Sequence, residues 1–481
     1  MLSNLRRRIN NSVNALLHPE YSQRMDTLPP RKLRAALTLP WVREKMVAFS
    51  NYEYLRNPYY GSVINKQSEQ TIGPCPTIIA TSESASDNDM MEDSHQDWTQ
   101  LNSIGKSLRE FRRQAGKTGL GLMIPTKIKT DHPVKLGYKV YGADALKNPR
   151  GININDRIID GIEYNENWDP IKFHFKNTDQ LHEGGHLRNL HEDTVPFDVG
   201  DVIWWSRGYE NGRIDPVPEC VAAFTVYPFI RRYLQASIEA AEFRTSFPMA
   251  LELDPTMYGK NELMQLQQLE KFEYQPRTVP TLPVGTSLKG LPSGASADQS
   301  DKMLRTMAAA CALCIDMPAN LALGDSSDSN MASAQVDIQP WKNHVNIDRF
   351  DLIPCMRRTF HHWYDRASLI RGLTPESSRP GNEFADWFPH VYVYDGLFQH
   401  PDPLKNANAR AVDMAGGSTT LNQVYASQGL NARRQIEREA KLFGIPYDKM
   451  CEIILATRSN LSIQILSGEP EIDDEPIQAK R

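Results

Sequence analysis

The chain has 481 residues, of which 40% are hydrophobic and 23% are charged, a composition typical of a folded protein that buries a sizeable core. No apolar run reaches the roughly 18 residues that a membrane-spanning helix needs, so the sequence excludes an integral membrane protein. The formal net charge of −5 argues against a sequence-reading DNA-binding protein of the usual basic kind.

The N-terminal part of the chain predicts helices followed by a small β-rich unit. Residues 31–66 carry apolar side chains at helical spacing, and Pro40 predicts an interruption. Residues 83–97 are Ser-rich and then acidic, which indicates a surface loop or the exposed start of a helix over residues 98–114. Between residues 118 and 177, short strand-like runs alternate with Pro, Gly and Asn, so we expect several short strands there.

Two helices separated by a proline-broken insert are predicted in the middle of the chain. Residues 227–246 have one apolar helical face, formed by Ile230, Leu234, Ile238 and Ala241. Prolines divide residues 247–294 into two extended segments around a short helix at residues 261–272. A second helix is expected over residues 298–315, with Asp298 as its N-cap.

The remaining chain is predicted to be mainly helical. In chain order we expect a polar loop at residues 316–333, a long helical stretch at 334–370 bent at Pro340 and Pro354, an aromatic strand region at 387–398, a helical region at 403–466 and a disordered acidic tail at 467–481. The loop is rich in Gly, Asp, Ser and Asn, the residues typical of turns.

One string matches a zinc-peptidase pattern. His182, Glu183 and His186 follow the spacing H-E-x-x-H, in which two histidines one helical turn apart bind zinc and the glutamate acts as general base. The two glycines between them each disfavour a helix by about 1 kcal/mol relative to alanine. Solvated loop histidines are therefore the preferred interpretation, and a zinc metallopeptidase remains an alternative.

Two further motifs indicate no enzyme chemistry. The string Gly116-Lys117-Thr118 lacks the glycine that a phosphate-binding loop needs five residues earlier, where Phe111 lies, and it follows a helical segment instead of a strand. Cys311 and Cys314 form a C-x-x-C at the end of an Ala-rich helix, which favours small packed thiols over a redox or zinc site. The six cysteines are few and scattered, so no disulfide framework is expected. We expect no enzyme, cofactor or bound metal.

Basic side chains leave a second alternative open. The segment KSLREFRR at residues 106–113, with Arg231, Arg232 and Arg244, could contact nucleic acid in a monomeric DNA-binding adaptor. Solvated helix faces or salt bridges explain such residues more often. An adaptor of this kind would be a particle of one subunit, and its affinity for DNA would fall as the salt concentration rises.

Several strings, in order along residues 50–450, resemble the lambda-type family of phage portal proteins. They are Arg56-Asn57-Pro58-Tyr59, the hairpin from Ile158 to Pro170, the turn from Arg207 to Arg213, the loop from Asp316 to Ala334, and His400-Pro401-Asp402-Pro403 continuing to Ala411. The departures from the family pattern at Glu210, Gln335 and Leu430 indicate a divergent member.

The resemblance implies an α+β portal fold with a β-rich wing, two stem helices, a small clip and a mostly helical crown. The implied parts are an N-terminal arm (1–50), wing (51–226), first stem helix (227–247), clip (248–296), second stem helix (297–315), tunnel loop (316–333), second part of the wing (334–402), crown (403–466) and acidic tail (467–481).

The same resemblance implies a ring, expected to be dodecameric, at the capsid vertex of the virion, assembled in the host cytoplasm. Double-stranded DNA would pass through its tunnel during packaging and ejection. The implied partners are further copies of the chain, the terminase large subunit, a head-completion or adaptor protein, and capsid and scaffold proteins, with no membrane partner. The residues implied to line the tunnel loop are Asp316, Asn320, Asp325, Ser326, Asp328 and Asn330, and those implied to face the terminase are Lys260, Lys271, Arg277 and Lys289.

Overall fold

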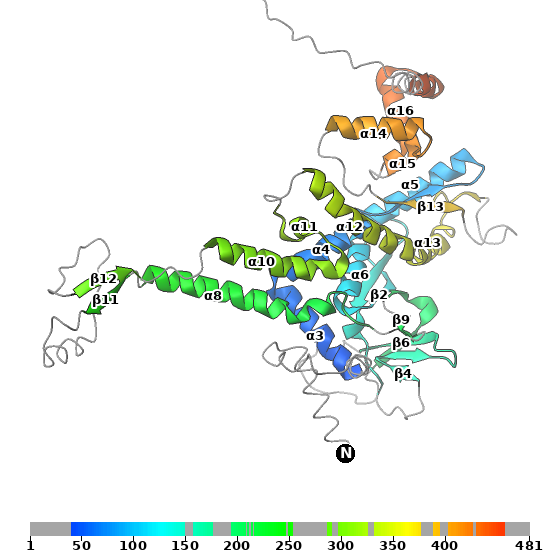
Figure 1. Ribbon diagram of the computed structural model, residues 1–481. Helices are drawn as coiled ribbons and strands as arrows, with labels where there is room; N and C mark the ends of the chain where they lie inside the picture. Colours follow the sequence, from blue (N-terminus) through cyan, green and yellow to red (C-terminus); the bar gives the residue numbers. More distant parts are fainter. Residues whose placement is uncertain are drawn as a thin grey trace, which may run out of the picture.

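The computed structural model confirms the α+β class. It describes residues 40–149, 157–176, 194–207, 209–210, 213–214, 216–246, 249–253, 286–290, 297–325, 331–376, 388–394, 403–426 and 430–456. A body of helices and antiparallel sheets carries two helices, α8 (Tyr227–Ser246) and α10 (Ala297–Ala312), that project together to one side (Figure 1). A C-terminal helical unit lies above the body in the same view.

The first helices are divided at Pro58. Helix α3 (Pro40–Arg56) ends one residue before Asn57, whose side chain caps α4 (Pro58–Ile72) by accepting a hydrogen bond from the Tyr59 backbone N–H at 3.1 Å. The missing N–H of proline costs nothing in a first helical turn, which explains why Pro58 starts a helix. The expected interruption at Pro40 coincides with the first residue of α3, and residues 31–39 lie outside the described part.

The acidic segment after residue 83 is helical, which agrees with the second of the two expected alternatives, the start of a helix, and not with a surface loop. Ser84 accepts a hydrogen bond from the Asp87 backbone N–H and starts α5 (Ala85–Leu101). The single helix predicted over residues 98–114 is interrupted, because Asn102 and Ser103 separate α5 from α6 (Ile104–Thr118). The amide of Asn102 donates to the carbonyl oxygens of Val134 and Leu136, and these bonds hold the turn against a strand.

The sheets in the described residues are small and antiparallel. Their strands are β1 (Thr77–Ala80) with β13 (His390–Val393); β3 (Leu136–Gly142), β2 (Gly121–Lys127) and β8 (Ile203–Trp205) in that order; β4 (Ile158–Ile159), β5 (Ile162–Tyr164), β6 (Pro170–Lys176) and β7 (Thr194–Asp198) in that order; and β9 (Tyr209–Glu210) with β10 (Arg213–Ile214). The predicted β-rich region is therefore confirmed. Asp160 and Gly161, both with positive φ, make the tight turn between β4 and β5.

The projecting helices confirm two sequence predictions and add a strand pair. Helix α8 has the predicted bounds, and α10 continues through the 3-10 turn η5 (Leu313–Ile315). The helix already begins at Ala297, so Asp298 lies in its first turn and the expectation of Asp298 as N-cap is wrong by two residues, within the ordinary uncertainty of helix ends. Beyond the two helices, β11 (Met249–Leu253) pairs with β12 (Thr286–Gly290). The helix expected at residues 261–272 lies outside the described part.

The polar loop and the long helical stretch differ from expectation in detail. The loop contains a short helix, α11 (Ala319–Leu323), and residues 331–333 already belong to α12 (Met331–Asp351). Helix α12 continues across Pro340, and the division before α13 (Ile353–Ala367) falls at Leu352, two residues before Pro354. The expected strand region is confirmed at β13.

The C-terminal region is helical, as predicted. It comprises α14 (Pro403–Ala415), α15 (Leu421–Ala426), α16 (Ala432–Phe443) and a further helical segment at residues 447–456. The acidic tail lies outside the described residues.

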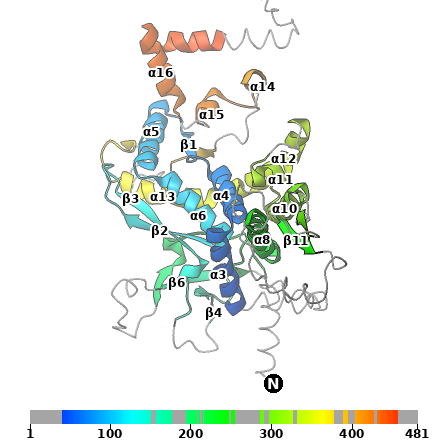
Figure 2. The same cartoon turned by 90° about the vertical axis from the view of Figure 1, so that its left-hand side faces the viewer.

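Separate hydrophobic cores support these parts. One joins α5, α6 and α13 around Trp98, Phe111 and Trp363, and a second fills the space between the sheets. A third joins α4 to the start of α8, the end of α10 and α12, with Tyr227 and Trp341 fully buried. Helix α4 lies beside α10 and α12 in both views (Figures 1 and 2). The base of the projecting helices is therefore packed firmly into the body.

Candidate functional site

The loop after α10 starts from a fixed point on the body. Asp316 has φ of 55°, a left-handed conformation that is uncommon outside glycine, and its Oδ2 atom lies 3.2 Å from Nδ1 of His344 in α12. The next side chain, Met317, is buried in the core beneath the projecting helices. The Asp316 side chain itself is 62% exposed. The loop therefore leaves the core with a carboxylate facing outward.

Two further contacts hold α11 in place. The Lys66 ammonium in α4 donates a hydrogen bond to the Leu321 carbonyl oxygen, one of those left unpaired at a helix end. Gly324, with φ of 71°, ends the short helix. Asp325 then pairs with Arg305 of α10 at 2.6 Å. The described part of the loop is thus bound to α4, α10 and α12 together.

A buried group of charged side chains lies next to this loop. We call Arg112, Arg207, Glu219, His344 and Asp348 the charge network. The Arg112 guanidinium is 1% exposed and donates to Asp348 Oδ2 from Nη2 at 2.6 Å and from Nε at 3.2 Å. Its other contact is Glu219, with Nη1 3.0 Å from Oε1. The ring of Trp205 lies 4.8 Å from the Arg112 guanidinium carbon and adds a cation–π contact.

The second arginine of the network connects it to the loop. The Arg207 guanidinium pairs with Asp348 Oδ1 through Nη2, while its Nη1 lies 2.8 Å from His344 Nε2. His344 contacts Asp316 on its other ring nitrogen. The network therefore links α6, the chain before α8, α12 and the loop, although these segments are far apart in sequence.

The electrostatics of the network follow from burial and opposite charge. Burial alone raises the pKa of Asp348, but the guanidinium groups of Arg112 and Arg207 more than offset it, and the pKa lies below its ordinary value. Burial and the neighbouring Arg207 lower the pKa of His344 below 6.5. At neutral pH His344 is therefore uncharged and leaves the Asp316 carboxylate uncompensated.

A second buried charge fixes α8. Glu53 of α3 is fully buried, and its Oε1 atom accepts a hydrogen bond from Arg231 Nη2 at 2.7 Å. The Arg231 guanidinium carbon also lies 5.1 Å from the centre of the Tyr52 ring. This pairing makes Arg231 a structural residue of α8.

The structure describes only some of the residues that the resemblance implied. Asp316, Asn320 and Asp325 lie together in the loop, where the Asn320 side chain accepts a hydrogen bond from the Leu321 backbone N–H. Of the residues implied to face the terminase, Lys289 lies in β12 opposite Ala250. The others, Ser326, Asp328, Asn330, Lys260, Lys271 and Arg277, lie outside the described residues.

The charge network and Lys66 were missed by sequence reasoning, although a signal was present. In α6 the buried positions include Leu108, Phe111 and Ala115, and Arg112 lies on the same face. In α12 the buried positions Trp341 and Val345 continue to Asp348 at helical spacing. A charged residue on the buried face of a helix indicates a buried partner of opposite charge. The identity of that partner depends on the tertiary structure.

The competing motifs that the structure describes have structural roles. Gly116, Lys117 and Thr118 end α6, so they do not begin a helix as a phosphate-binding loop requires. The Cys311 thiol is buried in the core beside Tyr227, and burial raises its pKa to about 12, which keeps it protonated and unreactive. All six cysteines are free. The H-E-x-x-H string lies outside the described residues.

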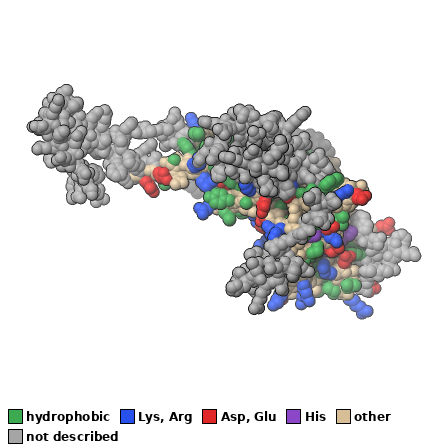
Figure 3. Space-filling view, turned by 90° about the horizontal axis from the view of Figure 1, so that it is seen from below, with side chains coloured by type: hydrophobic (Ala, Val, Ile, Leu, Met, Phe, Trp, Pro, Cys, Tyr) green, Lys and Arg blue, Asp and Glu red, His purple; other side chains and the backbone are tan. Residues whose placement is uncertain are grey.

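The basic helix α6 uses its arginines within the chain. Besides Arg112 in the network, Arg109 donates to the carbonyl oxygens of Gly73 and Pro74, and Arg113 pairs with Glu110. On the face in Figure 3, the visible Lys and Arg side chains are interspersed with Asp and Glu. Neither observation favours a DNA-binding adaptor.

The described residues contain no group of three or more His, Cys, Asp or Glu side chains placed to hold a metal ion. Within the same residues, no helix combines the length and the apolar character that a membrane crossing requires.

One known protein family matches this chain. A family model described as "Phage portal protein, lambda family" matches residues 59–346, more than half of the chain. No curated protein matches the chain.

Solved structures match the chain at low identity. A chain from the neck of an empty GTA particle has a TM-score of 0.44 and 13% identity, covering 83% of this chain and 94% of that chain. A chain from the virion of the native gene transfer agent (GTA) particle has a TM-score of 0.43 and 13% identity, with coverage of 83% and 93%. An HK97 family phage portal protein from Corynebacterium diphtheriae has a TM-score of 0.28 and 12% identity, with coverage of 60% and 82%.

Proposed function

We propose that this chain, which belongs to the lambda family of phage portal proteins, forms a closed dodecameric ring at the capsid vertex and acts as a DNA conduit and docking platform. Its role is structural and not catalytic. The observation that carries the proposal is the pair α8 and α10, which projects from the body (Figure 1) and exposes apolar side chains such as Ile238 and Met303.

The apolar face of α8 is covered only near the body. Ile230 is fully buried and Leu234, one turn further along α8, is half-buried. Ile238, two turns beyond Ile230, is 60% exposed. On α10, Ala308 and Ala312 are buried while Met303 is 54% exposed. Burying such side chains contributes about 25 cal/mol per Å² of apolar surface. Adjacent copies of the same helix pair in a ring would supply that burial, and a closed ring does so for every subunit.

The parts that the family resemblance implies can be assigned to the described elements as part of this proposal. We assign α8 and α10 to the stem (227–247 and 297–315), β11 and β12 to the clip (248–296), residues 316–333 to the tunnel loop and α14 to α16 to the crown (403–466). The wing comprises residues 51–226 and 334–402. A two-stranded sheet alone is marginally stable, so β11 and β12 would gain from neighbouring clips in the ring.

The loop supplies the surface that faces DNA in this proposal. The outward carboxylate of Asp316 is not compensated by the neutral His344, so it repels phosphate and favours free sliding of the duplex. Asp325 contributes less negative charge because Arg305 lies 2.6 Å away. Few basic contacts mean few released counterions and weak retention of DNA.

The proposed partners follow from these assignments. The terminase large subunit would bind at the clip, where Lys289 lies in β12, and a head-completion or adaptor protein would bind the assembled ring. Capsid and scaffold proteins would contact the portal in the virion, after assembly in the host cytoplasm. Double-stranded DNA would occupy the tunnel during packaging and ejection.

The deciding experiment is the native mass of the purified full chain, supported by negative-stain imaging. A ring gives a particle about twelve times the mass of one subunit, with a central opening. A particle of single-subunit mass with salt-sensitive DNA affinity would overturn the proposal and support a monomeric adaptor. Stoichiometric zinc in a metal analysis would instead support a peptidase using His182, Glu183 and His186.

A further inference from the structure

The C-terminal helical unit contacts the body where α16 begins beside α5. Helix α5 places three carboxylates on one face, those of Asp89, Glu92 and Asp93, at the spacing of helical neighbours. The first turn of α16 offers Arg433 and Arg434, together with the partial positive charge of a helix N-terminus. The contact is thus electrostatically complementary.

The two outer ion pairs of this contact are partly exposed. Arg433 pairs with Asp89, and Arg434 Nη2 lies 2.8 Å from Asp93 Oδ2. The arginine side chains are 42% and 44% exposed, so solvent screens both pairs and each contributes little by itself.

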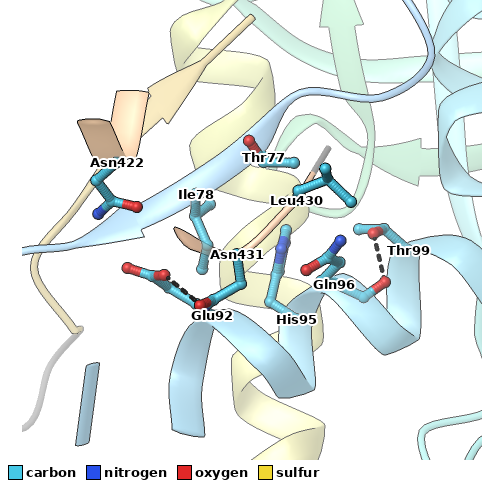
Figure 4. Close-up of a pocket in the computed structure, with 9 residues that line it drawn as sticks. All are labelled: Thr77, Ile78, Glu92, His95, Gln96, Thr99, Asn422, Leu430 and Asn431. Carbon is cyan, nitrogen blue, oxygen red and sulfur yellow. Dashed lines mark hydrogen bonds between the residues drawn. The ribbon is translucent and has the colours of Figure 1, made fainter. Parts of the chain in front are cut away.

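Glu92 is in a different environment, because it lines a pocket next to Asn431 (Figure 4). Its Oε1 atom accepts a hydrogen bond from the Ala80 backbone N–H at 2.9 Å, and its Oε2 atom accepts one from Asn431 Nδ2 at 3.2 Å. Asn431 is 8% exposed and is the N-cap of α16, because its Oδ1 atom accepts from the Arg434 backbone N–H. Glu92 and its pocket are therefore shared between the body, through α5 and β1, and the C-terminal unit, through Asn422, Leu430 and Asn431.

We propose that Glu92 is the proton-binding residue of a latch that holds the C-terminal helical unit on the body, and that uptake of one proton by its carboxylate strengthens the docking. The latch consists of Asp89, Glu92 and Asp93 on α5 and Asn431, Arg433 and Arg434 at the start of α16. It is a property of the single chain and does not depend on ring formation.

The electrostatic environment of Glu92 supports this role. The pKa of Glu92 is raised to about 7, chiefly by burial; the hydrogen bond from the Ala80 N–H opposes the rise, and the like charges of Asp89 and Asp93 add to it. Burial also raises the pKa of Asp93, and the Arg434 guanidinium opposes that shift. The Arg433 and Arg434 guanidinium groups stay charged throughout the neutral range.

The histidines near the latch do not account for a transition near neutrality. Burial lowers the pKa of His95, which lines the pocket, to about 3. Burial also lowers the pKa of His390, whose charge would act on His95 from β13. Both imidazoles are therefore neutral at pH 7, and the proton that binds near pH 7 is assigned to Glu92.

The raised pKa of Glu92 determines whether docking of the C-terminal unit strengthens or weakens with pH. The docked state holds Glu92 with a pKa near 7, while separation of α16 exposes the carboxyl to water and returns its pKa toward 4.5. The docked state therefore binds the proton more tightly, and docking strengthens as the pH falls through 7. A protonated Glu92 still accepts both hydrogen bonds, since its carbonyl oxygen faces Ala80 and its hydroxyl oxygen keeps a lone pair for Asn431.

The test is hydrogen exchange of the full assembled chain at pH 6 and pH 8, corrected for the intrinsic pH dependence of exchange. Protection of amides in α16 and β1 should be up to about tenfold higher at pH 6 than at pH 8. This is the ratio expected when the raised pKa of Glu92 returns fully to its ordinary value on separation of α16. Glu92→Gln, which keeps an acceptor for Ala80, should give equal protection at both pH values.

Controls separate the latch from general destabilisation. Asp97→Asn changes an exposed carboxylate of the same helix and should keep the pH dependence of the wild type. Arg434→Ala should lower protection by a similar factor at both pH values while leaving their ratio unchanged. Equal protection of the wild-type protein at pH 6 and pH 8 overturns the proposal. A difference in protection between the two pH values that persists in a folded Glu92→Gln protein also overturns it.

Discussion

Replacing Asp348 by asparagine tests the buried charge network most directly, because the change keeps the shape of the side chain and removes its charge. Asp348 is fully buried and pairs with both Arg112 and Arg207. In the variant, the amide presents one acceptor oxygen and an NH2 group to two guanidinium groups, which are donors only. Removing one partner of a buried ion pair costs about 3–5 kcal/mol, a large fraction of the roughly 5–15 kcal/mol that stabilises a domain.

The assay is urea unfolding followed by tryptophan fluorescence, since Trp205 and Trp341 lie close to the network. Asp351→Asn is the matched control, because Asp351 is an exposed carboxylate in the same helix and its loss should change the free energy of unfolding by less than about 0.5 kcal/mol. Equal urea midpoints for Asp348→Asn and the wild type would refute the argument that the network holds the base of the stem.

The pH dependence gives an independent check of the same prediction. The pKa of Asp348 in the folded chain lies below its ordinary value, so its contribution is complete above roughly pH 4 and is lost as the pH falls through the lowered folded-state pKa. The difference in stability between the wild type and Asp348→Asn should therefore be constant from pH 5 to 7 and shrink in strong acid. A difference that grows on acidification contradicts this sign.

Three further changes test the loop and the stem. Lys66→Met removes the hydrogen bond to the Leu321 carbonyl oxygen, and amide protection in α11 should fall by the equivalent of about 0.5–1.5 kcal/mol in hydrogen exchange. Replacing Asp325 and Asp328 together by lysine should slow or stall DNA packaging in vitro, because added positive charge retains the duplex. Ile238→Asp places a charge on the exposed apolar face of α8, and native mass should show loss of the ring in favour of smaller species.

Each of these changes has its own control. Lys45→Met alters an exposed lysine of α3, away from α11, and should leave the protection of α11 unchanged. Asp325→Asn with Asp328→Asn removes negative charge without adding positive charge, so it should slow DNA packaging less than the double lysine variant does. Unchanged packaging with the lysine variant would show that charge in the loop does not control how easily DNA slides. Ile238→Leu should assemble normally, and a complete ring of Ile238→Asp would show that this face is not a subunit contact.

The sequence was informative wherever a local rule decides the structure. The apolar spacing from Ile230 onward, with Pro228 in the first turn, predicted α8 with the bounds that the structure has. The short strand-like runs between residues 118 and 177, separated by Pro, Gly and Asn, likewise predicted the strands found there. Such signals lie within a few residues of one another, so no knowledge of the fold is needed to read them.

Local rules failed where a distant segment supplies the partner. The run of Asp and Glu in α5 left a surface loop and an exposed helix start as alternatives. In the structure Trp98 of that helix is fully buried and the acidic face meets α16, more than three hundred residues later in the chain. The loop after Met317 likewise contains a short helix whose end is bound by Lys66. In both cases tertiary contacts compensate for a weak local preference.

The order of the elements, the α+β class and the family were determined by the sequence alone, because periodicity, turn residues and motif order are local properties of the chain. The placement of the charges was decided only by the tertiary structure. Arg112, Arg207 and Asp348 meet in the interior because three separate segments pack together there, and at the surface Glu92 becomes a half-buried acid only where α16 covers it. Burial and opposite charge set the chemistry of these groups, and neither can be read from neighbours in sequence.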